Sequence, residues 1–547
     1  MTQIKRSEWL WVAVFGVLVL ALTCVPYIVG ALRSDDALRF SGFVIGVEDG
    51  NSYIAKMQLG AHGQWLFQLA YAVEEHPQSL MFLFYILLGK LIGAVVGTSD
   101  ALRLHDALVF GFHVARVLFG IAMIAVMYRF LAELLPRVRQ RRLALIAAVL
   151  GGGLGWLLVM IPKMDQPLEF YSPEAFSFLH LYGLPHLSAV RVFMLGGLLF
   201  YLRAVRGRWL WAFAAGSAWF VMTLIQPFYM IIVYVILVMH IAILAVLAFR
   251  QRDGELVRGV DVGAAAVRAL WVSALAGAFG LPLVLYTFLL FMVDPIYQTW
   301  GLQNVILSPS IIHYVSAWGL VALLGLFGLR SLFRRNLVAW ALVLGWLIVM
   351  PGLLYAPYNL QRRFSEGIFV PLVGLAMLGL TVGIGKGWLR RLVSRYGPLV
   401  LIAVSLPATG LVWVGGMIAA TQSRAPVFQP RDLVATYAFL GRSLPPRAVV
   451  ASSYQIGNAI PAYGHLVAYI GHGPETPALE FKRGQVSTFF ARTTLDVNRR
   501  DIYYGMGVPY VIIGPEERTA GFDPVQQAGG YLQMIFESGE YSVWSLK

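Results

Sequence analysis

The chain has 547 residues, of which 59% are hydrophobic and only 13% are charged, about half the roughly 25% of a soluble domain. Its mean hydropathy is +0.71. Soluble, fibrous and disordered classes are excluded, and the composition predicts a polytopic protein whose main partner is the lipid bilayer. Lys and Arg outnumber Asp and Glu by 42 to 28. Because the basic residues form short clusters between apolar runs, we interpret the excess as membrane orientation and expect no nucleic-acid partner.

Twelve apolar runs are candidates for membrane helices. They cover about 9–28, 80–96, 107–132, 143–161, 187–202, 209–226, 227–249, 269–293, 311–329, 337–355, 367–385 and 398–420. The first follows Lys5 and Arg6 without an obvious cleavage site, so we expect a membrane helix rather than a removed signal peptide. We divide 209–249 at Gln226-Pro227, because proline disrupts the helical hydrogen-bond ladder.

From residue 133 onward every second loop contains a basic cluster, and the intervening loops mostly do not. They are Arg137/Arg139/Arg141/Arg142, Arg203/Arg206/Arg208, Arg250/Arg252/Arg258, Arg330/Arg334/Arg335 and Lys386/Arg390/Arg391/Arg395. Cytoplasmic loops carry such clusters. Twelve crossings would place Lys5 on the wrong side, so we expect the short run 80–96, which contains Lys90, to be interfacial or re-entrant. The result is about 11 membrane helices (range 11–13) in the plasma or inner membrane, with a cytoplasmic N-terminus.

The tail differs from the rest in having more charge and short alternating apolar segments. Predicted strands are Ala448–Ser452, Leu466–Ile470, Tyr510–Ile513 and Tyr541–Leu546; predicted helices are Asp432–Leu440, Leu479–Arg492 and Val525–Glu537. We therefore expect a membrane domain over 1–422, with a long outer loop at 33–106, and a small extracytoplasmic α/β domain over 423–547. Gly457, Gly471 and Gly473 lack the GxGxxG spacing and are interpreted as turn glycines.

The first outer loop contains Glu48-Asp49-Gly50-Asn51-Ser52-Tyr53 and, further on, His76-Pro77. A carboxylate next to the membrane surface is suited to act as a general base toward an acceptor hydroxyl or amide. Low-dielectric surroundings would raise its basicity. The alternative interpretation is that Glu48 and Asp49 are solvated loop acids.

These residues resemble the C-type (GT-C) superfamily of membrane glycosyltransferases, which includes protein O-mannosyltransferases, aminoarabinose transferases and oligosaccharyltransferase catalytic subunits. Members typically have an Asp with a Tyr or Phe four residues later, then a His-Pro before a short apolar helix; Asp49, Tyr53 and His76 fit this pattern. The resemblance implies a GT-C-like helical bundle with in-plane helices in the first outer loop. Here the acids read Glu-Asp rather than the commoner Asp-Glu.

The loop at 162–186 contains Glu174, His180 and His186, and Arg191 lies one turn into the next span. The resemblance implies that acids in this loop assist the acceptor or a metal, and Glu174 is our candidate because it can start a helix. The histidines lack metal-pair spacing, so we assign no metal ligand and leave a divalent cation open. A plain polar loop is the alternative.

Arg362 and Arg363 lie on the predicted outer face, against the positive-inside trend. Arginine recognises phosphate through two parallel hydrogen bonds, and a polyprenyl-phosphate donor would place a phosphate at headgroup depth. We therefore predict that they contact the donor, with Tyr53, His76, Arg191 and Lys56 as further donor-binding candidates. Arginines that merely extend from a helix end to the interface are the alternative.

Together these features favour an inverting glycosyltransferase. It would transfer a sugar from a polyprenyl-phosphate-linked donor to a glycan, lipid or protein acceptor on the outer face, with Asp49 as the base. A lipid-glycan transporter or flippase is the second hypothesis, and a non-catalytic membrane scaffold is the third. Transporters often contain paired halves and mid-membrane charges, whereas here no repeat is evident and the acids cluster in loops.

Overall fold

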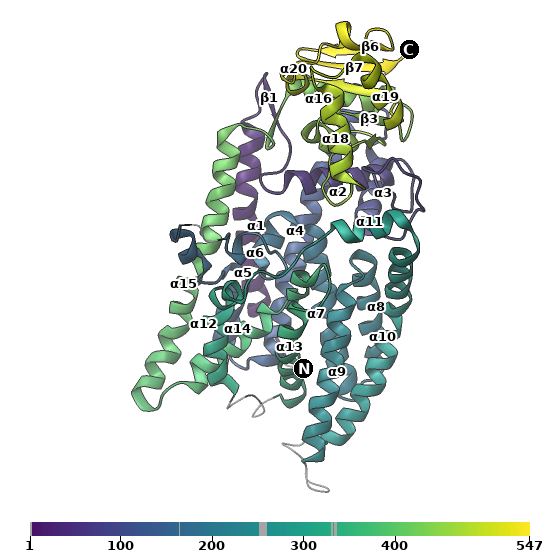
Figure 1. The fold of residues 1–547 in the computed structure, drawn as a ribbon. Coiled ribbons are helices and arrows are strands. Elements are labelled where there is room, and N and C mark those ends of the chain that lie inside the picture. Colours follow the sequence, from purple (N-terminus) through teal and green to yellow (C-terminus); the bar gives the residue numbers. More distant parts are fainter. Residues whose placement is uncertain (1–2, 163–164, 251–259, 330–331, 333–335) are drawn as a thin grey trace. The chain divides into compact units, whose positions relative to one another are not determined.

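A computed structural model describes residues 3–162, 165–250, 260–329, 332 and 336–547 (Figure 1). Among these residues, ten helical segments are long and apolar enough to span a bilayer. They are α1 (Arg6–Leu32), α4 (Ala101–Leu134), α5 with η1 (Val138–Leu150 and Gly155–Met160), α7 (Pro185–Val205), α9 (Tyr229–Phe249), α10 (Val262–Val293), α12 (Ile311–Leu329), α13 (Leu337–Leu354), η4 with α14 and η5 (Gln361–Ser365, Phe369–Leu378 and Gly379–Gly383) and α15 (Gly387–Gln422). The chain is an integral membrane protein built mostly of helices, as predicted.

The two remaining apolar runs form shorter helices. The run at 209–226 is α8 (Trp211–Ile225), which has 15 residues, and it separates from α9 at Gln226-Pro227 as predicted. The run expected not to cross is α3 (Leu83–Val96). Its 14 residues are fewer than the roughly 20 that a crossing requires. Arg252, Arg258, Arg330, Arg334 and Arg335 of the basic clusters lie outside the described residues.

The chain forms two compact units, each discontinuous in sequence. The first unit comprises Met1–Cys24, Ala115–Phe288 and Val305–Gly415; the second comprises Val25–Val114, Leu289–Asn304 and Gly416–Lys547. The second unit therefore combines the first loop, the short helix α11 (Pro295–Gln303) and the tail. The domain division predicted at residue 422 stays a prediction.

The first unit is a helical bundle in which α7 packs on α8, α9 on α13, and α12 on α14. Small residues bring α12 and the π-turn η5 into backbone contact. A Cβ added at Gly379 would lie 2.0 Å from the carbonyl oxygen of Leu324. Helix α6 (Ser177–Gly183) lies in the same unit, between two spans.

The tail contains a five-stranded mixed sheet in the order β4-β3-β5-β7-β6. Its strands are β3 (Val449–Ala451), β4 (Val467–Ala468), β5 (Tyr510–Ile513), β6 (Leu532–Ser538) and β7 (Tyr541–Leu546), and its helices are α16 (Arg431–Ser443), α17 (Tyr454–Ala459), α18 (Leu479–Phe490), α19 (Asp496–Met506), α20 (Pro515–Thr519) and α21 (Pro524–Ala528). A separate ladder joins β1 (Leu38–Phe40) to β2 (Phe428–Pro430). The four predicted strands are present, and β1 ties the first loop to the tail.

The helix predicted over Val525–Glu537 is wrong beyond residue 528. Asp523 caps α21 by accepting hydrogen bonds from the next two backbone N–H groups, and two glycines then follow. The apolar residues after them form β6, which pairs antiparallel with β7 through a turn at Gly539 (φ 54°). Tertiary pairing with β7 overrides the local helical pattern.

Helix α2 (Val47–Ala61) is held between α3 and the tail within the second unit. It contacts α3 so closely that a Cβ at Gly60 would lie 2.0 Å from the Ile86 carbonyl oxygen, and one at Gly89 would lie 1.9 Å from that of Met57. It also contacts α17 and the following 3₁₀ turn, Ile460–Ala462. One apolar core contains side chains from 43–112 and from 433–543, so first loop and tail fold around the same interior.

Candidate functional site

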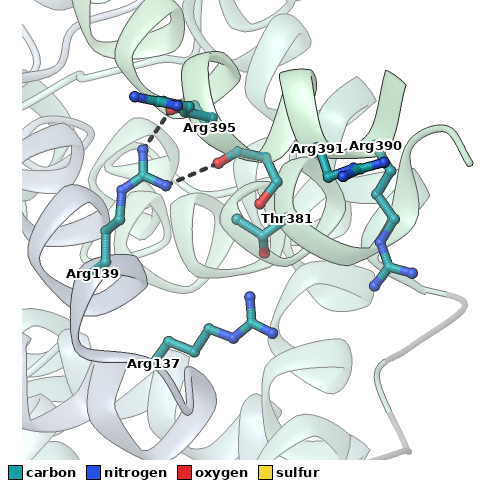
Figure 2. Close-up of a pocket in the computed structure, with 7 residues that line it drawn as sticks. Arg137, Arg139, Thr381, Arg390, Arg391 and Arg395 are labelled. Atoms are coloured by element: carbon teal, nitrogen blue, oxygen red, sulfur yellow. Dashed lines mark hydrogen bonds between the residues drawn. The ribbon is translucent and has the colours of Figure 1, made fainter. Parts of the chain in front are cut away.

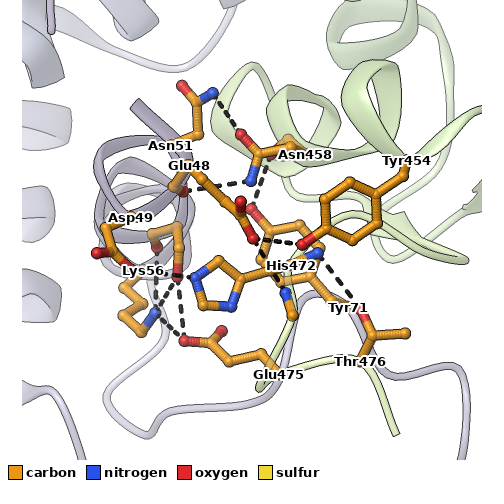
Figure 3. Close-up of polar contacts among 12 residues, drawn as sticks. Glu48, Asp49, Asn51, Lys56, Tyr71, Tyr454, Asn458, His472, Glu475 and Thr476 are labelled. Atoms are coloured by element: carbon orange, nitrogen blue, oxygen red, sulfur yellow. Dashed lines mark hydrogen bonds and ion pairs between the residues drawn. The ribbon is translucent and has the colours of Figure 1, made fainter. Parts of the chain in front are cut away.

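The predicted acids lie in the first turn of α2 (Figure 3). The helix begins after Gly46, whose φ of 57° is in the left-handed region that favours glycine. The N-terminus of a helix carries partial positive charge and stabilises negative side chains nearby. Both carboxylates therefore lie at the positive end of the α2 dipole.

Glu48 accepts hydrogen bonds from residues of the tail. Its Oε1 accepts hydrogen bonds from the hydroxyl of Tyr454 and from the backbone N–H of Gly473, the latter at 3.1 Å. Asn458 donates to the Glu48 carbonyl oxygen at 3.2 Å and accepts from the Asn51 amide at 2.8 Å. These bonds occupy one carboxylate oxygen of Glu48 and fix the start of α2 against α17.

Asp49 keeps 62% of its side chain exposed, and its Oδ1 lies 3.3 Å from Nε2 of the buried His472. The imidazole stacks on Tyr71, with ring centroids 5.4 Å apart. Burial alone would lower the pKa of His472, but the nearby carboxylates of Glu475 and Asp49 outweigh it and raise the pKa above its usual 6.5. An exposed carboxylate is thus paired with an imidazole that favours the cationic form.

Lys56 and Glu475 form a buried ion pair directly beneath this contact. Lys56 Nζ lies 2.7 Å from Glu475 Oε1, and the two side chains are 2% and 7% exposed. Lys56 and His472 hold the pKa of Glu475 below its usual value, although burial alone would raise it. Ser52 also bonds both partners, at 2.5 Å and 3.1 Å. The donor contact predicted for Lys56 stays a prediction, and the lysine already has an internal carboxylate partner.

His76 and Tyr53 also make internal contacts in the second unit. The Leu69 backbone N–H donates to His76 Nε2 at 3.0 Å, so Nδ1 must carry the proton, which it donates to the Glu74 carbonyl oxygen at 2.7 Å. Burial lowers the pKa of His76, which agrees with this neutral tautomer. Tyr53 stacks on Tyr85 at 4.7 Å within the apolar core. Their donor-binding roles stay predictions.

A second charged cluster lies within the first unit, around Arg191. This buried guanidinium donates to Glu366 Oε1 at 2.6 Å, to Ser177 Oγ at 2.8 Å and to the Glu174 carbonyl oxygen at 2.9 Å. Nε2 of the buried His180 lies 3.5 Å from Glu366 Oε2. Burial, followed by the charge of Arg191, lowers the pKa of His180 well below its usual value. Arg191 is therefore a structural charge whose partners are already in place.

The two predicted phosphate ligands lie at the start of the span Gln361–Gly383. Arg363 Nε is 3.7 Å from Glu174 Oε1, and the Arg363 side chain is 27% exposed. Arg362 lies over the ring of Tyr171, 4.7 Å from its centroid. Glu174, Arg191 and Arg363, which the sequence singled out separately, thus belong to one cluster.

The structure adds His472, Glu475 and Glu366, which the sequence analysis did not assign. His472 stands between Gly471 and Gly473, and a Cβ at Gly471 would lie 2.5 Å from the Gly457 carbonyl carbon. The paired glycines mark a loop whose backbone packs against α17, and this packing positions the imidazole.

Among the described residues, no group of three or more His, Cys, Asp or Glu side chains is gathered to hold a metal ion.

No protein-family model matches the sequence, and no curated protein matches it. Solved structures do resemble the fold. The archaeal oligosaccharyltransferase AglB from Archaeoglobus fulgidus, in complex with an inhibitory peptide and a dolichol-phosphate, gives a TM-score of 0.53 at 14% identity over 93% of this chain and 70% of that chain. The apo form of the A. fulgidus oligosaccharyltransferase gives 0.50 at 14% identity over 95% and 74%. The chain has the fold of a C-type membrane glycosyltransferase, as its resemblance to that superfamily predicts.

Loss of one partner of the buried pair should destabilise the protein strongly. Lys56→Met leaves the Glu475 carboxylate buried and unpaired, which typically costs about 3–5 kcal/mol. Lys56→Met/Glu475→Gln removes the charge from both and should recover part of the thermal stability. Melting temperatures of the purified variants in detergent test this. Arg483→Met is the control, because its pair with Glu480 is exposed and should contribute little. A double variant less stable than Lys56→Met would contradict the pairing.

The His472 contacts should stabilise the protein most at mildly acidic pH. Its pKa is raised in the folded state, so the contribution is complete below about 6.5 and is lost as pH rises through the raised value. The melting-temperature difference between wild type and His472→Gln should therefore shrink from pH 6 to pH 9. His465→Gln is the control, because burial lowers the pKa of His465 to about 4. The melting-temperature difference between wild type and His465→Gln should not grow on acidification. An effect of His472→Gln that increases with pH would oppose the assignment.

Proposed function

We propose that the protein is a membrane glycosyltransferase that transfers a sugar from a polyprenyl-phosphate-linked donor to an acceptor outside the cytoplasm. The observation that carries the proposal is the exposed carboxylate of Asp49 at the start of α2, against His472, in a chain with this fold. The similar archaeal oligosaccharyltransferase was solved with a dolichol-phosphate and an inhibitory peptide, which supports a lipid-phosphate donor. The acceptor class, whether glycan, lipid or protein, stays open.

Asp49 is the stronger candidate for the base. A general base must be accessible to the proton that it removes, and Asp49 keeps 62% of its side chain exposed. Glu48 Oε1 instead accepts hydrogen bonds from Tyr454 and Gly473, so this oxygen is already occupied within the protein. We assign Glu48 to positioning α2, and Asp49 to receiving the acceptor proton.

The proposed reaction is a single inverting displacement. The acceptor atom loses its proton to Asp49 and forms a bond to the anomeric carbon of the donor. The bond between that carbon and the phosphate oxygen breaks, and its electron pair leaves with the polyprenyl phosphate. The phosphate gains negative charge in this step, so a fixed guanidinium stabilises the transition state more than the ground state.

Arg363 and Arg362 are the proposed phosphate ligands. Arg363 is oriented by Glu174 at 3.7 Å, while part of its side chain remains exposed. Arg191 is buried and saturated by Glu366, Ser177 and the Glu174 carbonyl oxygen. We therefore assign Arg191 and Glu174 to positioning, and we give the phosphate contact to the two arginines of the Gln361–Gly383 span.

The basic clusters support a cytoplasmic N-terminus and an extracytoplasmic tail. In this orientation the residues around 48–53 and 359–366 face the outside, where nucleotide sugars are absent. A lipid-linked donor is consistent with that location.

Removal of the base should abolish most transfer. Asp49→Asn keeps the shape of the side chain but not the proton acceptor, and should lower turnover by about 10²–10⁴-fold. Glu48→Gln should have a smaller effect. The measurement is transfer of label from radiolabelled polyprenyl-phosphate sugars by purified protein, with melting temperature as the control for folding. An active Asp49→Asn with an inactive Glu48→Gln would reverse the two roles.

Loss of the phosphate ligands should lower turnover by roughly a hundredfold, as for one missing transition-state hydrogen-bond donor. We expect this for Arg362→Ala/Arg363→Ala in the same assay. Of the single variants Arg362→Lys and Arg363→Lys, the one at the arginine that contributes more should retain part of the activity. Lysine keeps the positive charge but cannot make two parallel hydrogen bonds to the phosphate. Arg442→Ala, an exposed position in α16, is the control. Wild-type turnover in the double variant would remove this loop from the mechanism.

A further inference from the structure

The first unit contains a basic cavity at the end of the Gln361–Gly383 span away from Arg362 and Arg363. It has a volume of about 640 Å³ and is lined by five arginines, Arg137, Arg139, Arg390, Arg391 and Arg395, together with Thr381 and Ser394 (Figure 2). The arginines come from the start of α5 and from the first turns of α15. The volume falls within the range of about 300–1,000 Å³ that is typical of ligand sites.

The cavity concentrates positive charge without an internal counter-charge. Within the described part of the chain, none of the five arginines forms an ion pair with a carboxylate. Two helices of 13 and 36 residues, α5 and α15, also begin here, and the N-terminus of each adds partial positive charge. Such a concentration of like charge is stabilised by a bound anion.

The cavity is held in shape by its own residues. Arg139 donates to the Arg395 carbonyl oxygen at 2.5 Å and to that of Ser394 at 3.3 Å, and so ties α5 to α15. Thr381 accepts from Gln140 at 2.6 Å and thereby links η5 to α5. Arg139 is thus occupied in forming the wall, and the remaining arginines can contact a ligand.

An apolar groove lies next to the cavity, on the neighbouring face of α15. It has a volume of about 330 Å³ and is lined by residues of α12, η5 and α15 that include Leu324, Leu380, Leu392, Tyr396 and Val400. Leu380 precedes Thr381, and Leu392 and Tyr396 alternate along α15 with the arginines of the cavity. A ligand with an anionic head and an apolar chain matches both hollows.

The depth in the membrane also fits a lipid. Helix α15 has 36 residues and is therefore about 54 Å long, whereas the hydrocarbon core is roughly 30 Å thick. Its basic first turns must project into the headgroup layer, while Leu392 and Val400 lead back toward the acyl chains. Basic pockets between membrane helices are suited to anionic lipid headgroups.

We propose that this cavity and groove form a binding site for an anionic phospholipid, with its phosphate among Arg137, Arg390, Arg391 and Arg395 and an acyl chain along the groove. The arginines supply charge-assisted hydrogen bonds to the phosphate oxygens, and the groove supplies apolar contact that a soluble phosphate cannot use. The site is separate from the proposed transfer reaction, because Arg362 and Arg363 lie at the other end of the same span.

Native mass spectrometry of the delipidated full-length protein, titrated with dioleoylphosphatidylglycerol, tests the site. Wild type should bind this lipid with higher affinity than dioleoylphosphatidylcholine. Arg390→Gln/Arg391→Gln/Arg395→Gln should raise its Kd at least about tenfold, the equivalent of one charge-assisted hydrogen bond. Arg208→Gln/Arg442→Gln/Arg500→Gln is the control, since it removes the same charge from exposed positions elsewhere. Equal affinity for the two lipids, or equal losses in the two triple variants, would overturn the proposal.

A second pair of variants separates a lipid from a soluble anion without changing charge. Leu392 and Leu411 lie on α15 and are each 46% exposed, but only Leu392 lines the groove. Leu392→Ser should weaken phosphatidylglycerol binding severalfold, and Leu411→Ser should not. Glycerol phosphate should bind wild type far more weakly than the lipid. Glycerol phosphate binding as tight as the lipid, or identical effects of the two serine variants, would assign the cavity to a soluble phosphate and overturn the lipid site.

Discussion

The buried ion pair between Lys56 and Glu475 determines the geometry of the second unit. It joins residues 419 positions apart and fixes the middle of α2 to the loop that contains His472. Gln303 of α11 holds the other side of that loop, through the Thr476 carbonyl oxygen at 2.8 Å and the Ala478 N–H at 2.9 Å. Because two buried charges are stable only as a well-bonded pair, α2 and the loop have little freedom to shift. The ion pair and the Gln303 contacts therefore hold the buried His472 beside the exposed Asp49.

In the first unit, too, a buried ion pair supports a more exposed charged side chain. Arg191 and Glu366 are buried together and are 2.6 Å apart, and the guanidinium also binds Ser177 and the Glu174 backbone. The partly exposed Arg363 then lies beside Glu174. In both units a buried, hydrogen-bonded ion pair fixes the backbone, and a more exposed charged side chain lies beside it. This arrangement provides preorganisation, in which the charged groups need little rearrangement when a ligand binds.

Features encoded by local pattern could be predicted from the sequence. The apolar runs, the break at Gln226-Pro227, the short helix around 83–96 and four tail strands depend on neighbours close in the chain. The strand β6 was missed because only its partner β7 distinguishes it from a helix. His472, Glu475 and Glu366 were missed for a related reason. Each acquires its role from a residue 175 to 423 positions away, and no periodicity connects them.

The second unit combines segments that are far apart in the sequence, so it cannot fold until the last of them has been synthesised. The first loop leaves the ribosome 419 residues before Glu475, which at 5–20 residues per second is roughly 20 to 80 seconds. During that interval Lys56 lacks its carboxylate, and the apolar residues at 43–112 lack the tail residues that complete their core. The loop must therefore be shielded from aggregation until Glu475 and its neighbours have been synthesised. A chain that terminates between Gln422 and Glu475 would retain all ten candidate spans of the described residues and still expose an unfinished core, which gives cellular quality control a feature by which to recognise it.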